Sequence, residues 1–251
     1  MKLSVDDGVA ELRISGPIDL DWASAFSECV RDLRECVGLR VVKLSGDGRF
    51  FCPGGDLSWM RDQSDPGGAI HQLATTLHDG VLGLAALNAP VVARVQGAAA
   101  GAGLSLVLGA DFAIAGASAT FTVAYTSVGL SPDGGASWLL PRIVGQRRAT
   151  ELILTSCRLS AADAAQLGII TSAVDDDALD ATVDAFVVQL AAGPTPAYGA
   201  TKRLLQRSSQ RDFADQLNAE ADSISTLAGS PTGQEGIAAF LDKRAAVFPG
   251  S

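Results

Sequence analysis

The sequence predicts an α/β protein, and three observations lead to that fold class. Apolar runs typical of buried strands occur at residues 39–44 and 91–95. Amphipathic stretches, with apolar residues at three- and four-residue steps, precede each of these runs and predict helices. Short turn-rich segments with glycines separate the two kinds of element. This alternation of strand, turn and helix is typical of an α/β core.

Size and charge narrow the class of protein further. The chain has 251 residues, of which 47% are hydrophobic, enough for one domain with a large core or for two small ones. The formal net charge of −9 argues against nucleic acid or an anionic membrane as a partner. No apolar run approaches the ~20 residues of a membrane span, and residues 1–7 are too short and polar for a secretory leader. We therefore expect a cytoplasmic protein without a membrane span.

The cysteines and histidines show no metal-binding pattern. The four cysteines are Cys29, Cys36, Cys52 and Cys157. They form no C-x-x-C pair, which fits a reducing cytosol. His71 and His78 stand seven residues apart on a polar stretch, and we expect both to be solvated. No metal site is expected.

The first segments follow the predicted alternation. Residues 9–14 alternate between apolar and polar side chains, which predicts a strand. A helix follows that Asp19 or Asp21 can cap and that Gly38 ends. Its apolar face consists of Trp22, Phe26, Cys29, Leu33 and Cys36. The run at 39–44 is the next strand.

A turn-rich loop at 45–57 leads into a short helix, with two adjacent glycines beside Asp56, which can cap that helix. The polar segment 62–68 follows, and we expect it to be mobile. A longer amphipathic helix comes next and ends before Pro90. Its apolar face consists of Ile70, Leu73, Leu77, Val81 and Leu84.

The chain is organised around residues 91–106. The β-branched run 91–95 predicts a buried strand, and the six residues 98–103 are all Ala or Gly, which lets another group approach the backbone closely. The apolar residues 104–108 then open a helix. Its N-terminal N–H groups suit a phosphate or a developing oxyanion.

The small residues of this elbow have two other interpretations. In the dinucleotide fingerprint G-x-G-x-x-G the third glycine would stand where Leu106 does, and no G-x-x-x-x-G-K-[ST] sequence occurs. A nucleotide-binding turn is therefore disfavoured. Close packing of a buried helix on a sheet would also explain the small residues.

The remaining segments continue the alternation. In order, we expect strands at 111–115 and 119–123, a tight loop at 129–135, a helix around 138–140, a short helix from Ser160 and a strand at 169–174. From Asp177 onward the chain is predicted to be nearly all helical. Residues 195–248 would form a cap or an oligomer surface.

Several motifs stand in a characteristic order. They are Phe-Cys-Pro-Gly-Gly-Asp-Leu at 51–57, Gln-Gly-Ala-Ala-Ala-Gly-Ala-Gly at 96–103, Gly-Leu-Ser-Pro-Asp-Gly-Gly at 129–135, Leu-Leu-Pro-Arg at 139–142, Leu-Ser-Ala-Ala-Asp-Ala at 159–164 and Phe-Leu-Asp-Lys-Arg at 240–244. The ordered set strongly resembles the crotonase superfamily, also called the enoyl-CoA hydratase/isomerase family, over nearly the whole chain. The start is less typical, because residues 16–20 replace an Asn-rich segment that is usual in the family.

The resemblance implies a particular architecture and ligand. A crotonase-like core of repeated ββα units in a spiral is expected over residues 1–194. A C-terminal helical region for trimerisation and for capping of CoA is expected over residues 195–251. A homotrimer or a hexamer is therefore expected. The ligand implied is an acyl-CoA thioester, with coenzyme A as part of the substrate and no other cofactor.

The resemblance also implies where the thioester binds. Its oxygen would lie between two backbone N–H groups, which map to Gly55 and Ala102, one from each elbow. Such an oxyanion hole stabilises an enolate, and the loss of one donor typically costs about 2.7–4 kcal/mol. Ala102 stands where the family commonly has Gly, but the donor is the main chain. Residues expected against the ligand are Pro53, Gly54, Asp56, Leu57, Gly101, Ser105, Tyr125, Phe240 and Lys243.

Some of these residues have a second interpretation. Phe240 and Lys243 resemble a C-terminal contact of the family to the CoA adenine and phosphates, often made across a subunit boundary, but Lys243 could equally be a surface lysine. Candidates for the wall of an acyl pocket are Trp59, Met60 and Trp138, and each could instead belong to the core.

The sequence departs from hydratases of the family at both catalytic glutamates. Their places are taken by Ser105 and Tyr125. Adding water to a double bond needs a group to activate the water and a proton for the α-carbon. Neither Ser nor Tyr ionises readily near neutral pH, so efficient hydration is not expected.

One carboxylate remains, Asp133, where family members that isomerise double bonds place their base. Its Pro-Asp-Gly-Gly sequence is similar to that of the isomerase-type members, such as the epoxyphenylacetyl-CoA isomerases of phenylacetate pathways. A shift of a double bond from Δ3 to Δ2 needs one base, which removes a proton at C2 and returns it at C4. Asp133 with apolar neighbours such as Val128 and Leu130 could do this. The other interpretation is an ordinary turn residue.

Three functions follow as hypotheses. The leading one is an enoyl-CoA isomerase of fatty acid or related acyl metabolism, with Asp133 as its single acid/base and Gly55 and Ala102 as its oxyanion hole. The second is an enoyl-CoA hydratase, a lyase, with atypical acid/base residues. The third is a non-catalytic acyl-CoA-binding protein that keeps the elbows without the chemistry.

Overall fold

The fold is built on a six-stranded sheet, in which all neighbouring strands except β1 and β2 run parallel. The structure is a computed structural model that describes residues 1–248. In spatial order the strands are β1 (Lys2–Asp6), β2 (Val9–Ile14), β3 (Val41–Gly46), β4 (Val91–Val95), β6 (Phe112–Gly116) and β9 (Ser172–Val174). Most residues of the inner strands β3, β4 and β6 are buried because helices cover both faces of the sheet, and the charged side chains within them, Lys43 and Arg94, are partly buried.

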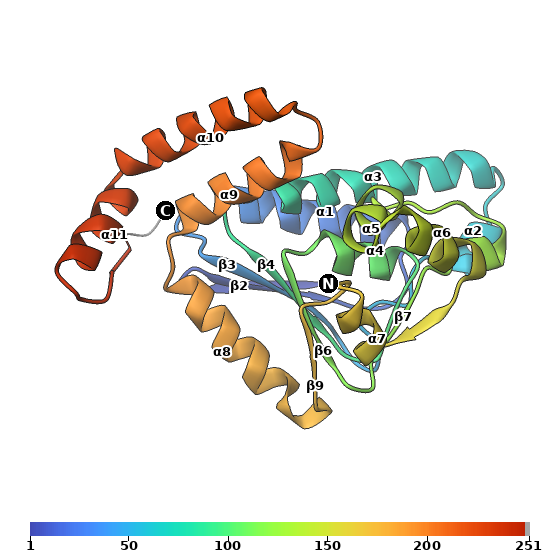
Figure 1. The fold of residues 1–251 in the computed structure, drawn as a ribbon. Coiled ribbons are helices and arrows are strands. Elements are labelled where there is room, and N and C mark those ends of the chain that lie inside the picture. Colours follow the sequence, from blue (N-terminus) through green and yellow to red (C-terminus); the bar gives the residue numbers. More distant parts are fainter. Residues whose placement is uncertain (249–251) are drawn as a thin grey trace.

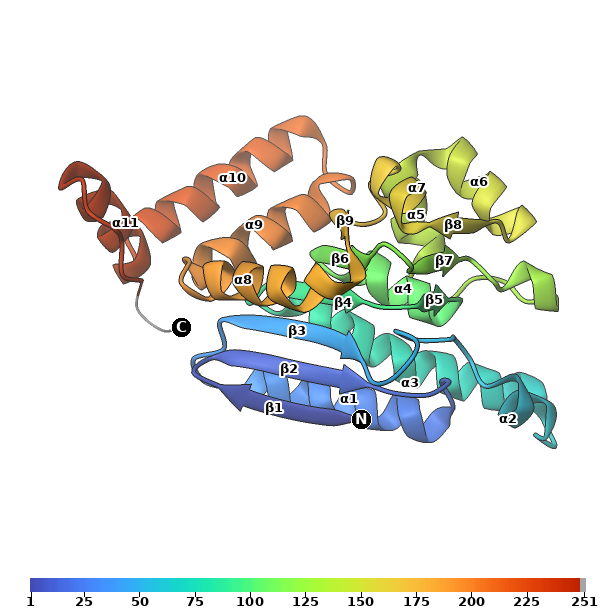
Figure 2. The ribbon, with the colours of Figure 1, turned by 90° about the horizontal axis from the view of Figure 1, so that it is seen from below.

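Helices on the two faces hold this sheet (Figures 1 and 2). α1 (Leu20–Glu35) and α3 (Pro66–Ala86) pack together on one face, and α8 (Leu179–Ala191) covers the other. The buried side chains of α8 form one apolar cluster with those of β3, β4 and β6. α3 approaches α1 so closely that a Cβ at Gly80 would lie 2.5 Å from the ring of Phe26. This contact explains the small residues within α3.

A second, three-stranded sheet leads from the large sheet toward the two elbows. It consists of β5 (Ala98–Ala100), β7 (Thr120–Thr122) and β8 (Arg158–Ser160), with β5 parallel to β7 and β7 antiparallel to β8. The first elbow joins its edge through a bridge between Cys52 and Ala99. The two motifs are thus paired as backbone segments.

Short helices connect the strands, and longer ones end the chain. The connecting helices are α2 (Leu57–Arg61), α4 (Ala102–Gly109), η1 (Thr126–Val128), α5 (Ala136–Val144), α6 (Gln146–Thr155), α7 (Ala161–Gln166) and η2 (Asp176–Ala178). The C-terminal helices are α9 (Thr195–Ser208), α10 (Phe213–Ala228) and α11 (Pro231–Leu241). α10 and α11 extend away from the sheet (Figure 1), and α10 has no buried residue. Within residues 1–248, no helix has both the length and the hydropathy needed to cross a bilayer.

The structure corrects several sequence-based boundaries. The helix expected from Ile70 begins at Pro66, and its N-cap Asp65 accepts a hydrogen bond from the N–H of Gly68, so the last residues of the polar segment 62–68 are helical. Residues 98–100 form a strand and not part of the elbow, because hydrogen bonds from both sides outweigh the weak strand propensity of alanine. The following helix starts at Ala102, two residues earlier than expected.

Other elements were missed or ended differently. β1, β8 and α6 have no counterpart among the predicted elements, and the helix around 138–140 extends over Ala136–Val144 with Pro141 inside it. Asp19, rather than Asp21, is the N-cap of α1. Cys36 lies just beyond that helix as its C-cap instead of on its apolar face.

Candidate active site

A largely apolar cavity of about 310 Å³ lies where α2, α3 and the start of α4 face the loop ahead of α5. Its apolar wall includes Leu57 and Met60 of α2, Ile70 and Leu73 of α3, and Val128 and Leu130 of the loop. Among the described residues that line it, Asp133 is the one acidic side chain. The cavity therefore offers space for an apolar group beside a single carboxylate.

The first elbow turns the N–H group of Gly55 away from its neighbouring strand. The N–H of Ile18 donates to the carbonyl of Gly54, and the N–H of Asp56 donates to the carbonyl of Ile18, each at 2.8 Å. In this parallel bridge the amide of the residue in between, Gly55, faces the opposite side. Asp56 then caps α2 by accepting from the N–H groups of its first turn. The elbow is thus fixed on both sides of Gly55.

The second elbow presents the N–H group of Ala102 in a similar way. The N–H of Gly101 donates to the carbonyl of Thr122 at 3.0 Å, which anchors the end of β5. Gly101 has a φ of 52°, where glycine is favoured, and turns the chain into α4. Ala102 is the first residue of that helix, so its N–H has no acceptor within the helix.

The two elbows touch each other beside the cavity. A Cβ at Gly54 would lie 2.7 Å from the carbonyl oxygen of Ala100, and Gly54 has a φ of 95°. Gly55 and Ala102 both line the cavity, and no acceptor within residues 1–248 is hydrogen-bonded to either N–H. Two unpaired amide donors on one apolar cavity can bind a carbonyl oxygen and stabilise it as it becomes an oxyanion.

A hydrogen-bonded network holds Asp133 in the wall of the same cavity. The Tyr125 hydroxyl donates to Asp133 Oδ1 at 2.6 Å, and Ser105 Oγ lies 3.0 Å from the Tyr125 hydroxyl oxygen. Ser105 Oγ also lies 3.0 Å from the main-chain carbonyl of Asp133, to which it can donate. These contacts fix both the main chain and the carboxylate of Asp133.

Tyr125, which is partly buried, and Ser105 support Asp133 in this network. Burial, together with the charge of the Asp133 carboxylate, raises the pKa of the Tyr125 phenol far above its ordinary value. The phenol therefore stays protonated and donates. Ser105 is fully buried on α4. The two residues at the expected glutamate positions thus hold the main chain and the carboxylate of Asp133 through hydrogen bonds.

His78 joins the same loop, which the sequence did not reveal. The N–H of Gly134 donates to His78 Nε2 at 3.0 Å, so the prediction that His78 is merely solvated is wrong. The two partners are 56 positions apart, and no local pattern marks the pair. His71 is exposed at the rim of the cavity.

Cys52 lies behind the elbows as a packing residue. It is 1% exposed, and burial raises the pKa of its thiol to about 11. A Cβ at Gly103 would collide with the carbonyl oxygen of Cys52, which explains the glycine at this position. The thiol is therefore protonated and shielded near neutral pH.

The other predicted residues divide into two groups. Pro53, Leu57 and Met60 line the cavity, whereas Trp59 and Trp138 are absent from its lining. The Trp138 ring instead lies under the guanidinium of Arg142, at 3.7 Å.

Phe240 lies at the end of α11 and Lys243 lies just beyond it, and α11 is drawn at the opposite side of the molecule from α2 (Figure 1). Phe240 is 83% exposed. Within one chain the structure does not bring Phe240 and Lys243 to the cavity.

Known proteins are similar to this chain in both sequence and fold. The enoyl-CoA hydratase/isomerase family profile matches residues 6–251. The chain is 36% identical over 256 residues to the 1,2-epoxyphenylacetyl-CoA isomerase of Escherichia coli K12, with 98% of this chain and 97% of that protein covered. A Rhodobacter capsulatus protein named as a probable enoyl-CoA hydratase is 34% identical over 254 residues, with 100% and 98% covered.

A solved structure of a known protein also superposes closely on this fold. The crystal structure of an enoyl-CoA hydratase from Polaromonas sp. JS666 superposes with a TM-score of 0.92 at 31% identity, with 98% of each chain covered. This match confirms the predicted crotonase-like α/β fold with its helical C-terminal region. The chain therefore belongs to the enoyl-CoA hydratase/isomerase family, within the crotonase superfamily.

Proposed function

We propose that this protein shifts the double bond of an enoyl-CoA thioester, with Asp133 as its one acid/base. The observation that supports this most strongly is the pairing of one carboxylate with two unpaired backbone N–H groups on the same apolar cavity. A double-bond shift needs one proton-transfer group and a site for a negatively charged oxygen.

Asp133 and the two backbone N–H groups account for every proton and electron pair that moves in this reaction. The Asp133 carboxylate takes a proton from C2 of a 3-enoyl thioester, and the electron pair of that C–H bond forms the dienolate. The N–H groups of Gly55 and Ala102 hold the negative oxygen. Asp133 then returns its proton to C4, which leaves the double bond between C2 and C3. Tyr125 donates to Oδ1, which leaves Oδ2 to exchange the proton.

The same features argue against hydration. Water addition needs a second group to position and activate water, and the two places for it hold a buried serine and a protonated phenol. The mostly apolar wall of the cavity favours binding of an acyl chain or ring over binding of water. The name of the Escherichia coli relative, an acyl-CoA isomerase, points in the same direction.

Self-association belongs to the same proposal. We infer that α10 and α11 join copies of this chain, as a trimer or hexamer, in the cytoplasm. Phe213, Ile224 and Phe240 are each at least 70% exposed on these helices, and contact with another copy would bury them. Such contact could also bring Lys243 to a neighbouring site.

A paired assay tests the function. Purified protein is given a 3-enoyl-CoA and, separately, a 2-enoyl-CoA, and double-bond migration and water addition are followed independently. Migration without 3-hydroxyacyl product is expected. Hydration of the 2-enoyl ester would favour the atypical hydratase, and saturable binding of both esters without turnover would favour a non-catalytic acyl-CoA-binding protein.

A further inference from the structure

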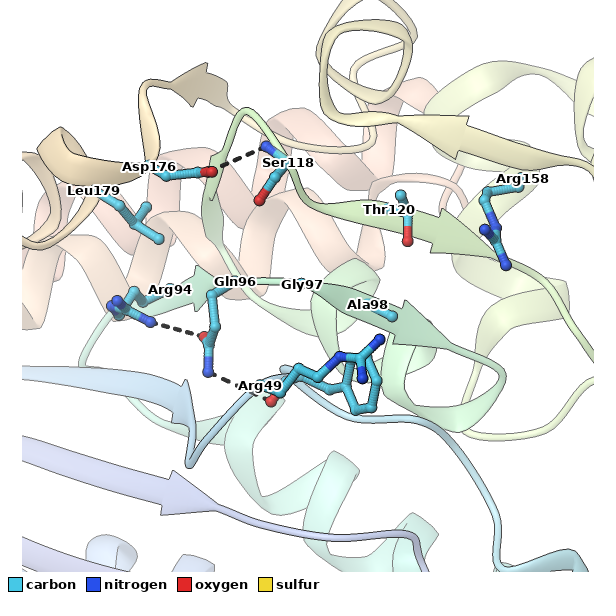
Figure 3. A pocket seen from close by; sticks show the side chains of 11 residues that line it. Arg49, Arg94, Gln96, Gly97, Ala98, Ser118, Thr120, Arg158, Asp176 and Leu179 are labelled. Carbon is cyan, nitrogen blue, oxygen red and sulfur yellow. Dashed lines mark hydrogen bonds between the residues drawn. The ribbon is translucent and has the colours of Figure 1, made fainter.

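A second cavity, larger than the acyl cavity, lies away from Asp133 and is lined by arginines. It measures about 700 Å³, within the range of sites for small organic molecules, and shares no lining residue with the acyl cavity. Arg49, Arg94 and Arg158 reach it from three separate segments, as Figure 3 shows. The rest of the lining is Phe50, Gln96, Gly97, Ala98, Ser118, Thr120, Asp176 and Leu179.

The charges in this cavity are only partly balanced. Arg94 Nε lies 2.5 Å from Asp180 Oδ1, so its charge is neutralised. The Asp176 carboxylate accepts from the N–H of Ser118, and hydrogen bonds with Ser118 lower its pKa. Within residues 1–248 neither Arg49 nor Arg158 forms an ion pair with a carboxylate. A positive surplus therefore remains here, although the chain carries 28 acidic and only 19 basic residues.

The surrounding backbone fixes the segment that carries Arg49. Arg94 Nη1 donates to Gln96 Oε1, and Gln96 Nε2 donates to the carbonyls of Gly46 and Gly48 at 2.8 and 3.2 Å. A Cβ at Gly97 would collide with the carbonyl oxygen of Arg49, so glycine is needed where the two segments meet. The loop is thus held before any ligand arrives.

The side chains themselves complete a site for an anion. The guanidinium of Arg49 lies 4.7 Å from the centre of the Phe50 ring, which limits its motion. Guanidinium groups bind the oxygens of a phosphate with paired N–H donors, and the Thr120 hydroxyl faces the same space. Phe50 and Leu179 offer apolar surface for an attached organic group.

We propose that this cavity binds an organic phosphate through Arg49 and Arg158, at a site separate from that of the acyl thioester. The phosphate could belong to a free nucleotide or to the nucleotide portion of a CoA molecule, and both present the same chemistry. The volume exceeds what inorganic phosphate alone would fill.

Isothermal titration with ADP as the probe tests this proposal. The full-length protein is titrated alone, with a saturating non-reactive acyl-CoA present, and as the variants Arg49→Gln and Arg158→Gln. Arg148→Gln, on an exposed arginine paired with Glu151, is the control with the same change in net charge. ADP should bind saturably, and each cavity variant should weaken binding by about tenfold or more, since a hydrogen bond to a charged group contributes about 1.5–3 kcal/mol.

The outcomes separate the alternatives. Binding that persists beside saturating acyl-CoA supports a site for a free nucleotide-like phosphate, and a second, weaker CoA-binding event lost in both variants supports the CoA nucleotide as the source. Absence of saturable ADP binding to the wild type overturns the proposal, as does unchanged binding in both cavity variants. A fall in oligomer size in Arg49→Gln and Arg158→Gln without any effect on ADP would show that the arginines serve a subunit contact instead.

Discussion

The acyl cavity and the arginine-lined cavity lie toward opposite ends of the same pair of backbone segments. Residues 49–55 and 97–102 run side by side, with the bridge between Cys52 and Ala99 in the middle. At one end the main chain supplies the donors, through Gly55 and Ala102, within an apolar wall. At the other end, arginine side chains supply the hydrogen-bond donors, and the wall of the cavity is more polar.

The difference shows which kind of site a sequence discloses. Backbone donors leave no trace in composition except the small residues that let the segments meet. Side-chain donors appear as arginines but reveal no common site until the fold joins them. The following predictions test whether catalysis depends only on the end of the segments that lines the acyl cavity.

Asp133→Asn should have the largest effect. The amide cannot accept the C2 proton, and loss of a general acid/base typically lowers turnover by about 10²–10⁴-fold. The Kd for an acyl-CoA should stay within about threefold, because the carboxamide has nearly the same shape. Initial rates and a binding titration check both statements, and Arg148→Gln should turn over like the wild type. A variant that isomerises at the wild-type rate would remove Asp133 from the mechanism.

Ala102→Pro removes one N–H donor of the oxyanion hole and changes the side chain only slightly. Proline is accommodated at the first position of a helix, and Gly101 before it has no Cβ to meet the ring. Loss of one donor should cost about 2.7–4 kcal/mol, or about 10²–10³-fold in kcat. Thermal unfolding should show that the variant is folded. Normal turnover in a folded variant would mean that Ala102 does not contact the reacting oxygen.

Tyr125→Phe should lower kcat by about 10- to 100-fold, because a hydrogen bond to a charged group contributes about 1.5–3 kcal/mol. The carboxylate of Asp133 then loses its fixed orientation. The other tyrosine, Tyr198, packs near α8 and provides the matched control, Tyr198→Phe. Equal rates for the two variants would contradict a role for Tyr125 in orienting Asp133.

His78→Leu should lower kcat by about 3- to 10-fold and leave KM nearly unchanged, since one neutral hydrogen bond contributes about 0.5–1.5 kcal/mol. It leaves the N–H of Gly134 without its acceptor. His78→Gln should restore much of the rate, because the Gln carbonyl can replace Nε2. Gln72→Leu, at an exposed position of the same helix outside the cavity lining, is the control. Failure of Gln to exceed Leu would indicate a packing role only.

Cysteine labelling should show the smallest effect and test the rigidity of the segment between the cavities. Burial raises the pKa of Cys52 to about 11, so at pH 8 the reactive thiolate is nearly absent. Its reactivity would rise only as the pH approaches that value. Peptide mapping after iodoacetamide treatment should find exposed Cys157 alkylated and Cys52 protected until urea is added. Prompt labelling of Cys52 in the native protein would show that the paired segments open.

The sequence revealed the parts of this molecule that local patterns encode. The apolar run 91–95, the helix caps and the ordered motifs led to the fold class and to Asp133. The strand at Ala98–Ala100 was missed because pairing with β7 and Cys52 determines it, not propensity. His78 was missed because its partner, Gly134, lies far away in the chain, and the arginine-lined cavity was missed because its three arginines come from separate segments. Contacts of this kind exist only after folding.

The central claim is that one carboxylate and two backbone donors move a double bond without adding water. The most direct test follows a 3-enoyl-CoA by NMR in D₂O, with wild type and Asp133→Asn at equal concentration. The account predicts that the wild type forms the 2-enoyl ester, with deuterium only at positions that exchange through the dienolate, and no 3-hydroxyacyl product, while the variant leaves the substrate unchanged. Formation of the 3-hydroxyacyl ester by the wild type, or equal double-bond migration in the variant, would contradict it.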